Sequence, residues 1–510
     1  MRRLFRGLRR APDAEYDVVV IGAGIGGLMA ANLLARGGMR ALLVEQHYMV
    51  GGYCSTFKRA GYTFDAATHF YPILGNPRSL TGRLLQELGV TTGWVQMDPV
   101  DVFHFPDGSK FEVPPDSDTY RARLKAEFPA EAAALDGYFA EVEQLYLMGL
   151  LHFFRDRELP NLRQFRDMSV QDAMDRHFQD RKLKLLLTAD SPHWGSPPGR
   201  VSHVFDSILR VSYFLGNYYP RGGSQAFADE LARTFEQHGG HVLTSTAARR
   251  IVVEGGAARG VELEVLRGPL RGPIRVRAGA VVSNSDMMDT MTRLVGREHC
   301  PPELVEGWSR LRPSCSCFIT HLGLRDVAAA ELEAAQGHYW DSWDADQLGR
   351  GAFAFKVFVP TLYEPAMAPP GGQVVIVQKV MEVDYERIGE TGWERHKETI
   401  ETFILERLRR LIPRLDERIV HCSSASAQTA WRFTSNYQGA MLGWEMAPDQ
   451  LGAHRPPPVA PVADLHFVGA WTRPGGGINP VIVSAQRLAA RLLRPAQDTA
   501  PAPASAAPHP

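Results

Sequence analysis

The sequence predicts an α/β fold with two parts, one of alternating strands and helices and one built on an antiparallel sheet. Residues 18–21 form a short β-branched run, followed at once by glycines and an apolar helix over residues 28–34. A second glycine cluster, residues 474–477, precedes a helix near the other end of the chain. Between them, three β-rich segments follow one another without the helices that parallel strands need, at residues 315–324, 353–359 and 374–383.

The first glycine cluster has the G-x-G-x-x-G spacing, with Gly22, Gly24 and Gly27. Gly22 permits a tight turn, Gly24 lets backbone N–H groups approach a diphosphate, and Gly27 lets the helix pack closely on the strand. The next predicted strand ends in Glu45, whose carboxylate suits the hydroxyls of an adenosine ribose and would repel the ribose phosphate of NADP. Residues 16–45 therefore predict a Rossmann-type dinucleotide-binding unit.

The residues after Glu45 distinguish between dinucleotides. Gly51-Gly52, Cys54, Thr56-Phe57, Phe64-Asp65 and His69 follow in order. This arrangement resembles the phytoene desaturase, carotenoid isomerase and retinol saturase superfamily, most of all its retinol saturase branch, within a wider group that includes the flavin amine oxidases. The resemblance implies FAD, with the glycine pair beside the diphosphate and the segment ending near His69 along the flavin. Ala67 stands where the family usually has glycine, so the loop is expected to follow a slightly different path.

The last segment predicts a second cofactor contact. The glycine triplet, residues 475–477, leads to a helix that we expect to begin with Asn479 as its cap and Pro480 at its first position. A helix N-terminus carries about half a positive charge, which suits the negative pyrimidine side of a reduced flavin. The family usually has a small residue at the position of Trp471, so this side chain is expected to lie near the substrate.

These motifs and the resemblance together give a predicted set of cofactor-binding residues. The set is Gly22, Ala23, Gly24, Gly27, Glu45, Gln46, Gly51, Gly52, Tyr53, His69, Phe70, Ala248, Asn284, Gly469, Ala470, Gly476, Gly477, Ile478 and Asn479. The resemblance places the backbone of Ala248 at the adenine. The catalytic residue is not identified by the sequence; His69 is the candidate acid or base, ahead of Arg432, Tyr437 and Trp444.

The composition limits the partners. Lysine plus arginine number 56 and aspartate plus glutamate 57, which points to no polyanionic partner, and nothing resembles a nucleic-acid module. Five cysteines make no disulfide framework or metal-ligand set, so we expect no metal and a reducing cytoplasm. No apolar run is long enough to span a bilayer. The first ten residues, MRRLFRGLRR, are either an interfacial anchor on anionic lipid or a disordered basic leader.

Periodicity and turn residues predict the remaining elements. A β-hairpin is expected around Asp107-Gly108, and Pro129 should begin a helix. The apolar run at residues 145–154 lines a substrate tunnel, dips into a membrane surface or is a core helix; the sequence leaves all three open. Ser224 is expected to cap the helix 225–238. The predicted organisation is a basic leader (1–14), a discontinuous FAD-binding domain (15–80, 220–290 and 460–495), a substrate or membrane-facing domain (81–219 and 291–459) and a disordered tail (496–510).

The predicted function is an FAD-dependent oxidoreductase, peripheral to a membrane, that acts on C–C bonds of a long apolar polyene or isoprenoid. Desaturation, saturation and cis–trans isomerisation are not separated by the sequence. Two alternatives remain. One is a flavin amine oxidase, which usually needs an aromatic cage and a lysine near the flavin, for which no convincing match is found. The other is a non-enzymatic prenyl- or lipid-binding protein of related fold, against which the intact glycine triplet argues.

Overall fold

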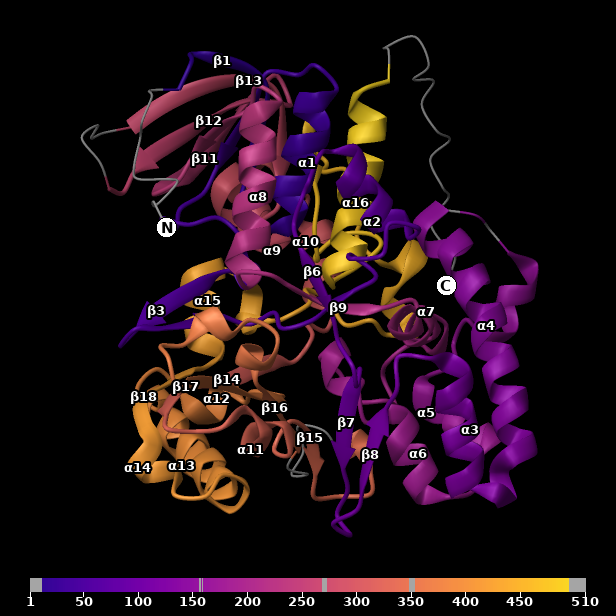
Figure 1. Ribbon diagram of the computed structural model, residues 1–510. Helices are drawn as coiled ribbons and strands as arrows, with labels where there is room; N and C mark the ends of the chain where they lie inside the picture. Colours follow the sequence, from indigo (N-terminus) through magenta and orange to yellow (C-terminus); the bar gives the residue numbers. More distant parts are fainter. Residues whose placement is uncertain (1–11, 156, 158, 268–272, 348–353, 495–510) are drawn as a thin grey trace.

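Two seven-stranded sheets form the framework of the protein (Figure 1). The computed structural model describes residues 12–155, 157, 159–267, 273–347 and 354–494. The basic leader up to residue 11 and the predicted tail, residues 496–510, lie outside this described part of the chain.

The first sheet joins segments from the whole length of the chain. Its order is β10-β2-β1-β13-β12-β11, with β19 also paired to β13. The pairings of β10, β2, β1, β13 and β19 are parallel, while β11 to β13 form an antiparallel meander. The bounds are β1 (Glu15–Ile21), β2 (Ala41–Val44), β10 (His241–Leu243), β11 (Thr246–Glu254), β12 (Ala257–Val265), β13 (Pro273–Ser283) and β19 (Leu465–Phe467). The parallel part is the predicted Rossmann-type unit.

Three helices from distant segments cover this parallel part. The helix α1 (Ile25–Arg36) packs against both α8 (Ser224–Gln237) and α16 (Ile478–Leu492), as Figure 1 shows at the top of the molecule. Their apolar faces share one buried cluster with β1 and β2, which includes Leu28, Phe227 and Leu488. The short α2 (Leu80–Glu87) packs on α16.

The second sheet has the order β18-β14-β17-β16-β15-β7-β8. All its pairings are antiparallel except that of β15 with β7, so the predicted antiparallel sheet is present with one parallel join. The bounds are β7 (Asp101–His104), β8 (Lys110–Val113), β14 (Ser316–Arg325), β15 (Gly337–Trp340), β16 (Ala354–Phe358), β17 (Gly372–Met381) and β18 (Ile419–Ala425). The helix α13 (Trp393–Leu411) covers one face through Ile400, Ile404 and Leu408.

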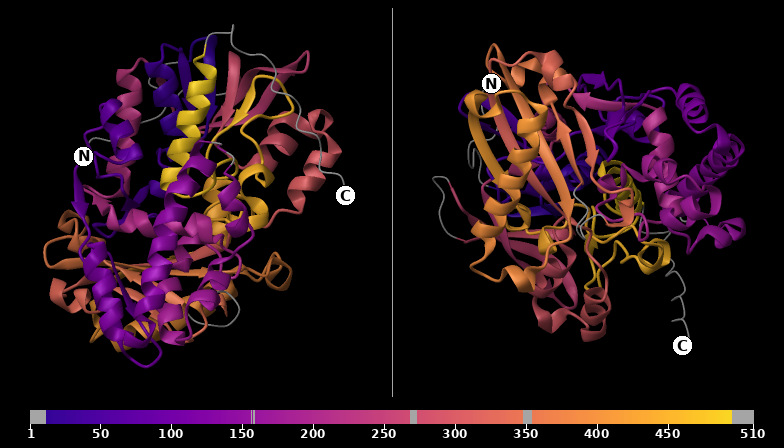
Figure 2. Two further views of the ribbon diagram at one scale, coloured as in Figure 1. Left: turned by 90° about the vertical axis from the view of Figure 1, so that its right-hand side faces the viewer. Right: turned by 90° about the horizontal axis from the view of Figure 1, so that it is seen from below.

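A group of helices lies beside the second sheet, as both views in Figure 2 show. It comprises α3 (Ser117–Glu127), α4 (Ala132–Arg155), α5 (Val170–His177), α6 (Arg181–Thr188) and α7 (His203–Phe214). The apolar run 145–154 is the last part of α4, where Leu145, Phe153 and Phe154 are buried and Leu147 is exposed. No helix in the described part of the chain is long and apolar enough to cross a membrane.

Smaller elements connect these layers. The strands β3 (Thr56–Arg59) and β4 (Tyr62–Asp65) form a hairpin, and β5 (Tyr71–Pro72), β9 (Asn217–Pro220) and β6 (Trp94–Gln96) form a small sheet. The short helices are α9 (Met287–Asp289), α10 (Pro302–Ser309), α11 (Ala329–Glu333), α12 (Tyr385–Ile388), α14 (Leu415–Arg418) and α15 (Ala427–Thr434).

Two predicted helix caps are wrong. The helix α8 begins at Ser224 itself and its cap is Gly223, while the Ser224 hydroxyl donates to the Thr68 carbonyl oxygen at 3.0 Å. The helix α16 begins at Ile478 with Gly477 as its cap, so Asn479 and Pro480 are its second and third residues. In both cases a glycine takes the positive φ of the turn into the helix, +80° and +98°, and leaves the polar side chain free for a partner elsewhere.

Candidate functional site

The glycine turn after β1 is held by close backbone packing between the turn and the helix α1. A Cβ atom at Gly27 would lie 2.0 Å from the Gly22 carbonyl oxygen, so only glycine permits this approach of helix to strand. Gly22 has φ of +93°, and Gly24 is the cap residue of α1. The start of α1 lines the cavity described below, and a helix N-terminus at that place suits an anionic diphosphate.

Glu45 is tied to this turn from the end of β2. Its Oε2 accepts the Ala23 N–H at 2.8 Å and its Oε1 accepts the His47 N–H at 2.8 Å. Burial raises the pKa of Glu45, and the His47 and Ala23 amides act against that rise. A carboxylate has about four acceptor sites, so both oxygens can also accept ribose hydroxyls.

The glycine pair is packed against the same turn. Gly51 donates to the Ala23 carbonyl oxygen at 2.8 Å and has φ of +113°. A Cβ atom at Gly52 would face the Gly24 Cα at 3.3 Å. Between the two glycine segments the backbone is therefore not covered by side chains, and a side chain at either segment would fill this space. We call this uncovered backbone the glycine strip.

One cavity of about 740 Å³ connects these segments to the second sheet. Most of the predicted cofactor residues line it: Gly22, Gly24, Glu45, Gln46, Gly51, Gly52, Tyr53, His69, Phe70, Ala248, Asn284, Ala470, Gly477, Ile478 and Asn479. Four predicted residues, Ala23, Gly27, Gly469 and Gly476, are not part of its wall. Gly27 and Gly476 act in packing instead, since a Cβ atom at Gly476 would lie 2.1 Å from the Leu442 carbonyl oxygen.

The N-terminus of α16 forms one end of the cavity wall, from Gly477 to Val481. Asn479 fixes its position, because Nδ2 donates to the Pro72 carbonyl oxygen at 2.9 Å and Oδ1 accepts from Thr81 Oγ1 at 2.7 Å. Trp471 also lines the cavity, and its Nε1 donates to Asn436 Oδ1 at 2.9 Å. The place of Trp471 near the substrate stays a prediction.

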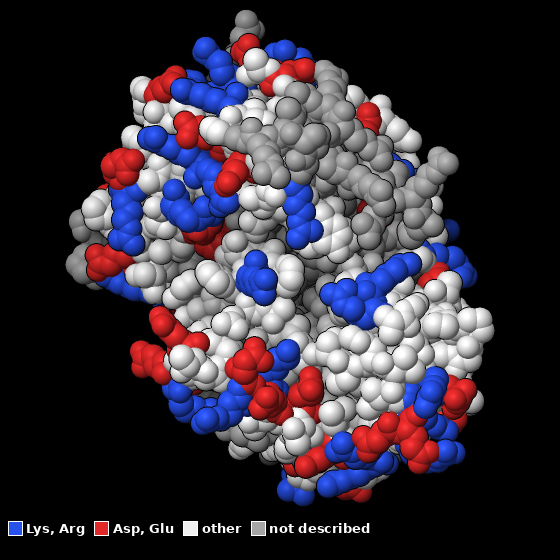
Figure 3. All heavy atoms as spheres, turned by 90° about the vertical axis from the view of Figure 1, so that its left-hand side faces the viewer, with Lys and Arg blue, Asp and Glu red and all other residues white. Residues whose placement is uncertain are grey.

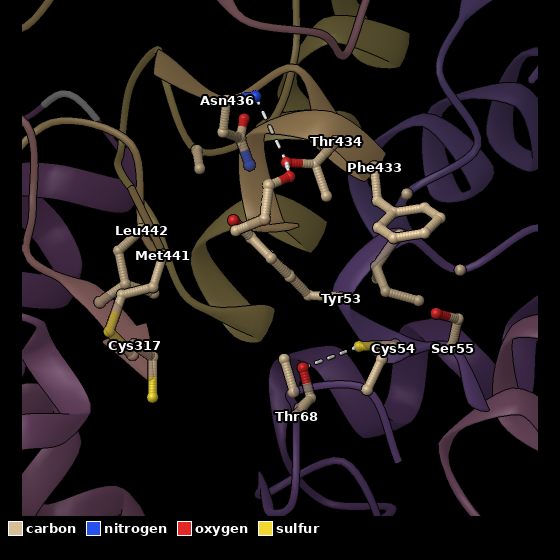
Figure 4. Close-up of a pocket in the computed structure, with 18 of the residues that line it drawn as sticks. Tyr53, Cys54, Ser55, Thr68, Cys317, Phe433, Thr434, Asn436, Met441 and Leu442 are labelled. Atoms are coloured by element: carbon tan, nitrogen blue, oxygen red, sulfur yellow. Dashed lines mark hydrogen bonds between the residues drawn. The ribbon is translucent and has the colours of Figure 1, made fainter. Parts of the chain in front are cut away.

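Figure 4 shows the middle of this cavity. The side chain of Tyr53 reaches into it, and its hydroxyl donates to the Ala440 carbonyl oxygen at 3.1 Å. Met441, Leu442 and Cys317 lie on the opposite side from Phe433 and Ser55. The wall of the second sheet adds the apolar side chains of Ile319 and Val380.

His69 lies in the cavity wall and is 6% exposed. Burial, with a contribution from the Lys356 charge, holds its pKa well below the ordinary range, so the ring is neutral at neutral pH. The other candidates are not in the cavity wall: Trp444 is buried against Trp471, and Arg432 and Tyr437 are exposed.

Among the polar side chains of the cavity that sequence reasoning missed are Lys356, His193, His338 and Gln378. They stand on β16, on the loop after α6, on β15 and on β17, and none belongs to a local motif. The pairing of β15, β16 and β17 brings His338, Lys356 and Gln378 together, and His193 meets Lys356 from outside the sheet.

The described residues fit FAD. The glycine strip, the acid at the end of β2 and the N-terminus of α16 are held in one cavity wall by the contacts given above. A bound dinucleotide requires backbone that is free of side chains, because its diphosphate occupies the space that a Cβ atom would fill.

Comparison with known proteins identifies the family. A model of flavin-containing amine oxidoreductases matches residues 25–493. All-trans-retinol 13,14-reductase of Danio rerio is 25% identical over 511 residues, covering 90% of this chain and 83% of that protein. Phytoene desaturase (neurosporene-forming) of Cereibacter sphaeroides is 27% identical, covering 94% and 95%. Prolycopene isomerase of Daucus carota is 24% identical, covering 94% and 80%.

Solved structures show the same fold. An oxidoreductase from Methanosarcina mazei is similar with a TM-score of 0.64 at 18% identity, over 92% of this chain and 99% of that one. Putrescine oxidase bound to putrescine gives a TM-score of 0.64 at 17% identity, over 94% and 100%. The chain therefore belongs to the family of flavin-containing amine oxidoreductases, and is an FAD-dependent oxidoreductase of the phytoene desaturase, carotenoid isomerase and retinol saturase superfamily.

Proposed function

We propose that the protein acts on C–C bonds of a long apolar polyene or isoprenoid, by desaturation, saturation or cis–trans isomerisation. The observation that carries this proposal is the continuity of the cavity, which runs from the glycine strip to an apolar wall on the second sheet. Substrate bonds placed against that wall would lie next to the flavin held at the N-terminus of α16. The names of the three relatives give retinol, phytoene and prolycopene, which are all chains of this class.

Bound FAD supplies two-electron chemistry, as a donor or an acceptor of hydride. The chain supplies position and surroundings. Ile319 and Val380 keep water away from the reacting bond, and the N-terminus of α16 favours negative charge beside it. His69, held neutral, can accept a proton within the cavity.

Amine oxidation is the competing reaction, since putrescine oxidase has the same fold. The structure places Lys356 in the cavity wall, which meets one of the two usual requirements of that reaction. However, the Lys356 ammonium is already paired with the Asp101 carboxylate at 2.8 Å, so it is not the free lysine that amine oxidation would use. The polyene class is favoured for that reason.

The cavity mouth supports a peripheral position on a membrane, and the cysteine content favours the cytoplasmic side. Phe433 and Tyr48 line the cavity and are 52% and 41% exposed, and Trp431 on the same helix, α15, is 59% exposed. In Figure 3, which shows the left-hand face of Figure 1, basic side chains surround a hollow and acidic ones lie farther out. Exposed aromatic side chains with basic neighbours are typical of interfacial binding, and a polyene would enter from the lipid without crossing water.

The test is conversion by the FAD-loaded protein. Phytoene, prolycopene and all-trans-retinol are each offered in liposomes, with the flavin oxidised in one series and reduced in another, and putrescine serves as the amine control. We expect a shift in the polyene absorption spectrum with one of the three and none with putrescine. Turnover of putrescine alone, with hydrogen peroxide released, would overturn the proposal.

A further inference from the structure

A cluster of ionisable side chains in the cavity wall is not used by the function proposed above. Lys356, His193 and His338 line the cavity, and Asp101, at the start of β7, lies beside them. The Lys356 ammonium donates to Asp101 Oδ2 at 2.8 Å and lies 3.4 Å from His193 Nε2. His338 Nε2 donates to the same carboxylate oxygen at 3.1 Å.

The cluster carries one charged pair and no net charge. Burial on its own would raise the pKa of Asp101, but Lys356 and His338 hold it well below the ordinary range. Burial lowers the pKa of His193 and of His338, so both rings are neutral. Asp101, His193 and His338 are close enough to ligate a cation, with ligand atoms within 4.8 Å of one another. The Lys356 ammonium already provides the positive charge that a bound cation would bring to these ligands. We therefore interpret the cluster as a hydrogen-bonding site and not as a metal site.

Lys356 has capacity for one more hydrogen bond. An ammonium group has three N–H donors, and the described residues give it two partners, Asp101 and His193. Next to it lies the face of the Phe70 ring, with the nitrogen 5.4 Å from the ring centroid. The third N–H group of Lys356 has no hydrogen-bond acceptor among the described residues.

His69 offers the complementary group. Its Nδ1 lies 3.5 Å from the Ala67 carbonyl oxygen, which can only accept, so Nδ1 carries the proton and Nε2 is a lone-pair acceptor. Nε2 is buried and has no hydrogen-bond partner among the described residues. The ring centroids of His69 and His193 are 5.8 Å apart, so this acceptor belongs to the same part of the cavity as the Lys356 donor.

We propose that Lys356 and His69 form a subsite for a hydroxyl group on the polyene or isoprenoid substrate. The hydroxyl oxygen accepts from the Lys356 ammonium, and its O–H donates to His69 Nε2. The inference rests on the proposed function and narrows its substrate class to an isoprenoid alcohol. A carbonyl group would satisfy Lys356 alone. A carboxylate would face Asp101 and the His69 lone pair, and a hydrocarbon would leave both groups unpaired.

The experiment compares three probes that share one carbon skeleton. They are geranylgeraniol, its methyl ether, which accepts but cannot donate, and the hydrocarbon in which hydrogen replaces the hydroxyl. Each is delivered from cyclodextrin to FAD-loaded protein, and the bound fraction is measured by equilibrium partition and mass spectrometry. We expect the alcohol to bind roughly tenfold or more tightly than the hydrocarbon, with the ether between them, because one of its hydrogen bonds is to a charged group.

Variants assign the two hydrogen bonds. Lys356→Met combined with Asp101→Asn removes the ion pair without leaving a buried charge, and should abolish the preference of the ether over the hydrocarbon. His69→Phe should abolish only the preference of the alcohol over the ether. Lys379→Met is the matched control, since Lys379 is a buried lysine on β17 that does not line the cavity, and it should keep both preferences.

Three outcomes contradict the inference and are distinguishable. Equal binding of all three probes to the FAD-loaded protein would mean that the cavity binds isoprenoid chains without recognising a hydroxyl group. The proposed function would then be unaffected. Binding of none of the three removes the proposed function together with the subsite. Equal binding of alcohol and ether would show that His69 Nε2 serves another partner.

Discussion

The Ala23 amide and the Glu45 carboxylate are joined by a hydrogen bond of 2.8 Å, which links the glycine turn after β1 to the end of β2. The second oxygen of Glu45 holds the His47 amide, also at 2.8 Å. Glu45 therefore shapes the loop that faces the cavity, in addition to offering acceptors to a ribose. This dual position makes Glu45 a sharp test of the cofactor site.

We expect Glu45→Ala to weaken FAD binding by about 1–3 kcal/mol, because ribose hydroxyls and two backbone amides lose their acceptor. Glu45→Gln retains one acceptor oxygen and should lose clearly less. The measurement is the FAD dissociation constant of apoprotein, followed by flavin fluorescence. An unchanged constant in Glu45→Ala would show that the ribose lies elsewhere.

The two glycines of the turn should respond differently to substitution. A Cβ atom at Gly27 meets the Gly22 carbonyl oxygen at 2.0 Å, so Gly27→Ala should destabilise the apoprotein by about 1–3 kcal/mol or more. At Gly24 the nearest atom is the end of the Asn284 side chain, at 3.0 Å. Gly24→Val should leave the fold intact and yield colourless protein, because it blocks the diphosphate approach. Thermal unfolding and the flavin absorbance of the purified variants separate the two effects; a yellow Gly24→Val protein would contradict our placement of the diphosphate.

The sequence could predict those parts of the site that depend on neighbouring residues, and not those that depend on distant ones. The glycine turn, Glu45 and the terminal glycine triplet are local features, in which a few consecutive residues determine the backbone. That Gly22, Gly24, Glu45 and Gly477 meet at one cavity was therefore predictable. The caps of α8 and α16 were not, because Ser224 and Asn479 bond to Thr68, Pro72 and Thr81, which lie far away in the sequence.

The polar cluster of the cavity was beyond sequence reasoning for the same kind of reason. Asp101 and Lys356 are 255 positions apart and meet only because β7 and β16 join one sheet through β15. A single lysine in a β-rich segment gives no sign that it faces a cavity. The order of strands in a sheet, which sets such meetings, depends on packing of the whole chain.

Membrane binding should depend on the aromatic side chains of α15. Trp431→Ser combined with Phe433→Ser is expected to reduce binding to anionic liposomes in a flotation assay, since both exposed rings would otherwise be buried in the interface. Leu147→Ser is the control on α4, where Leu147 is 62% exposed and belongs to the apolar run considered above. A loss of binding in Leu147→Ser with none in the α15 variant would move the docking surface to α4.

Binding should also fall with salt, and more steeply in the full chain than after deletion of residues 1–10. Each basic residue near an anionic surface contributes about 1 kcal/mol, and the deleted segment carries five arginines. Failure of the full chain to float with anionic or neutral liposomes would refute peripheral association.

Stability should fall as the solution becomes more acidic, in part through His193. Burial holds the folded-state pKa of His193 well below about 6.5, the ordinary value of a histidine, which the side chain regains in the unfolded state. Below that pH the unfolded chain binds a proton that the folded chain does not, so the free energy of unfolding falls by up to about 1.4 kcal/mol per pH unit. Above it, both states are neutral and the contribution is constant.

His193→Gln should therefore reduce the acid dependence of the unfolding midpoint measured between about pH 5 and pH 8. Glutamine can still bond to Tyr213, which lies 2.7 Å from His193 Nδ1, so the variant is expected to fold. Identical slopes for the two proteins would show that His193 is not buried as described.

The start of α16 gives the last prediction. If its amides face the pyrimidine side of the flavin, they stabilise the reduced, anionic form more than the oxidised one, by roughly 0.3–2 kcal/mol. For a two-electron couple, 1.4 kcal/mol corresponds to about 30 mV. Gly477 has φ of +98° at the cap of this helix, so Gly477→Val must displace the backbone there. The reduction potential of the bound flavin should then fall by up to about that amount, while FAD stays bound through Glu45 and the first glycine turn.

A dye-coupled reductive titration of the variant against the unchanged protein measures this shift. Gly256→Val is the matched control, because Gly256 also has positive φ, +78°, and lies in the β11–β12 turn outside the cavity wall. It imposes similar backbone strain without approaching the cofactor, and its potential should be unchanged. If Gly477→Val binds FAD fully and also keeps the original potential, then the start of α16 contributes no charge stabilisation, and the glycine triplet serves only to pack the chain against Leu442.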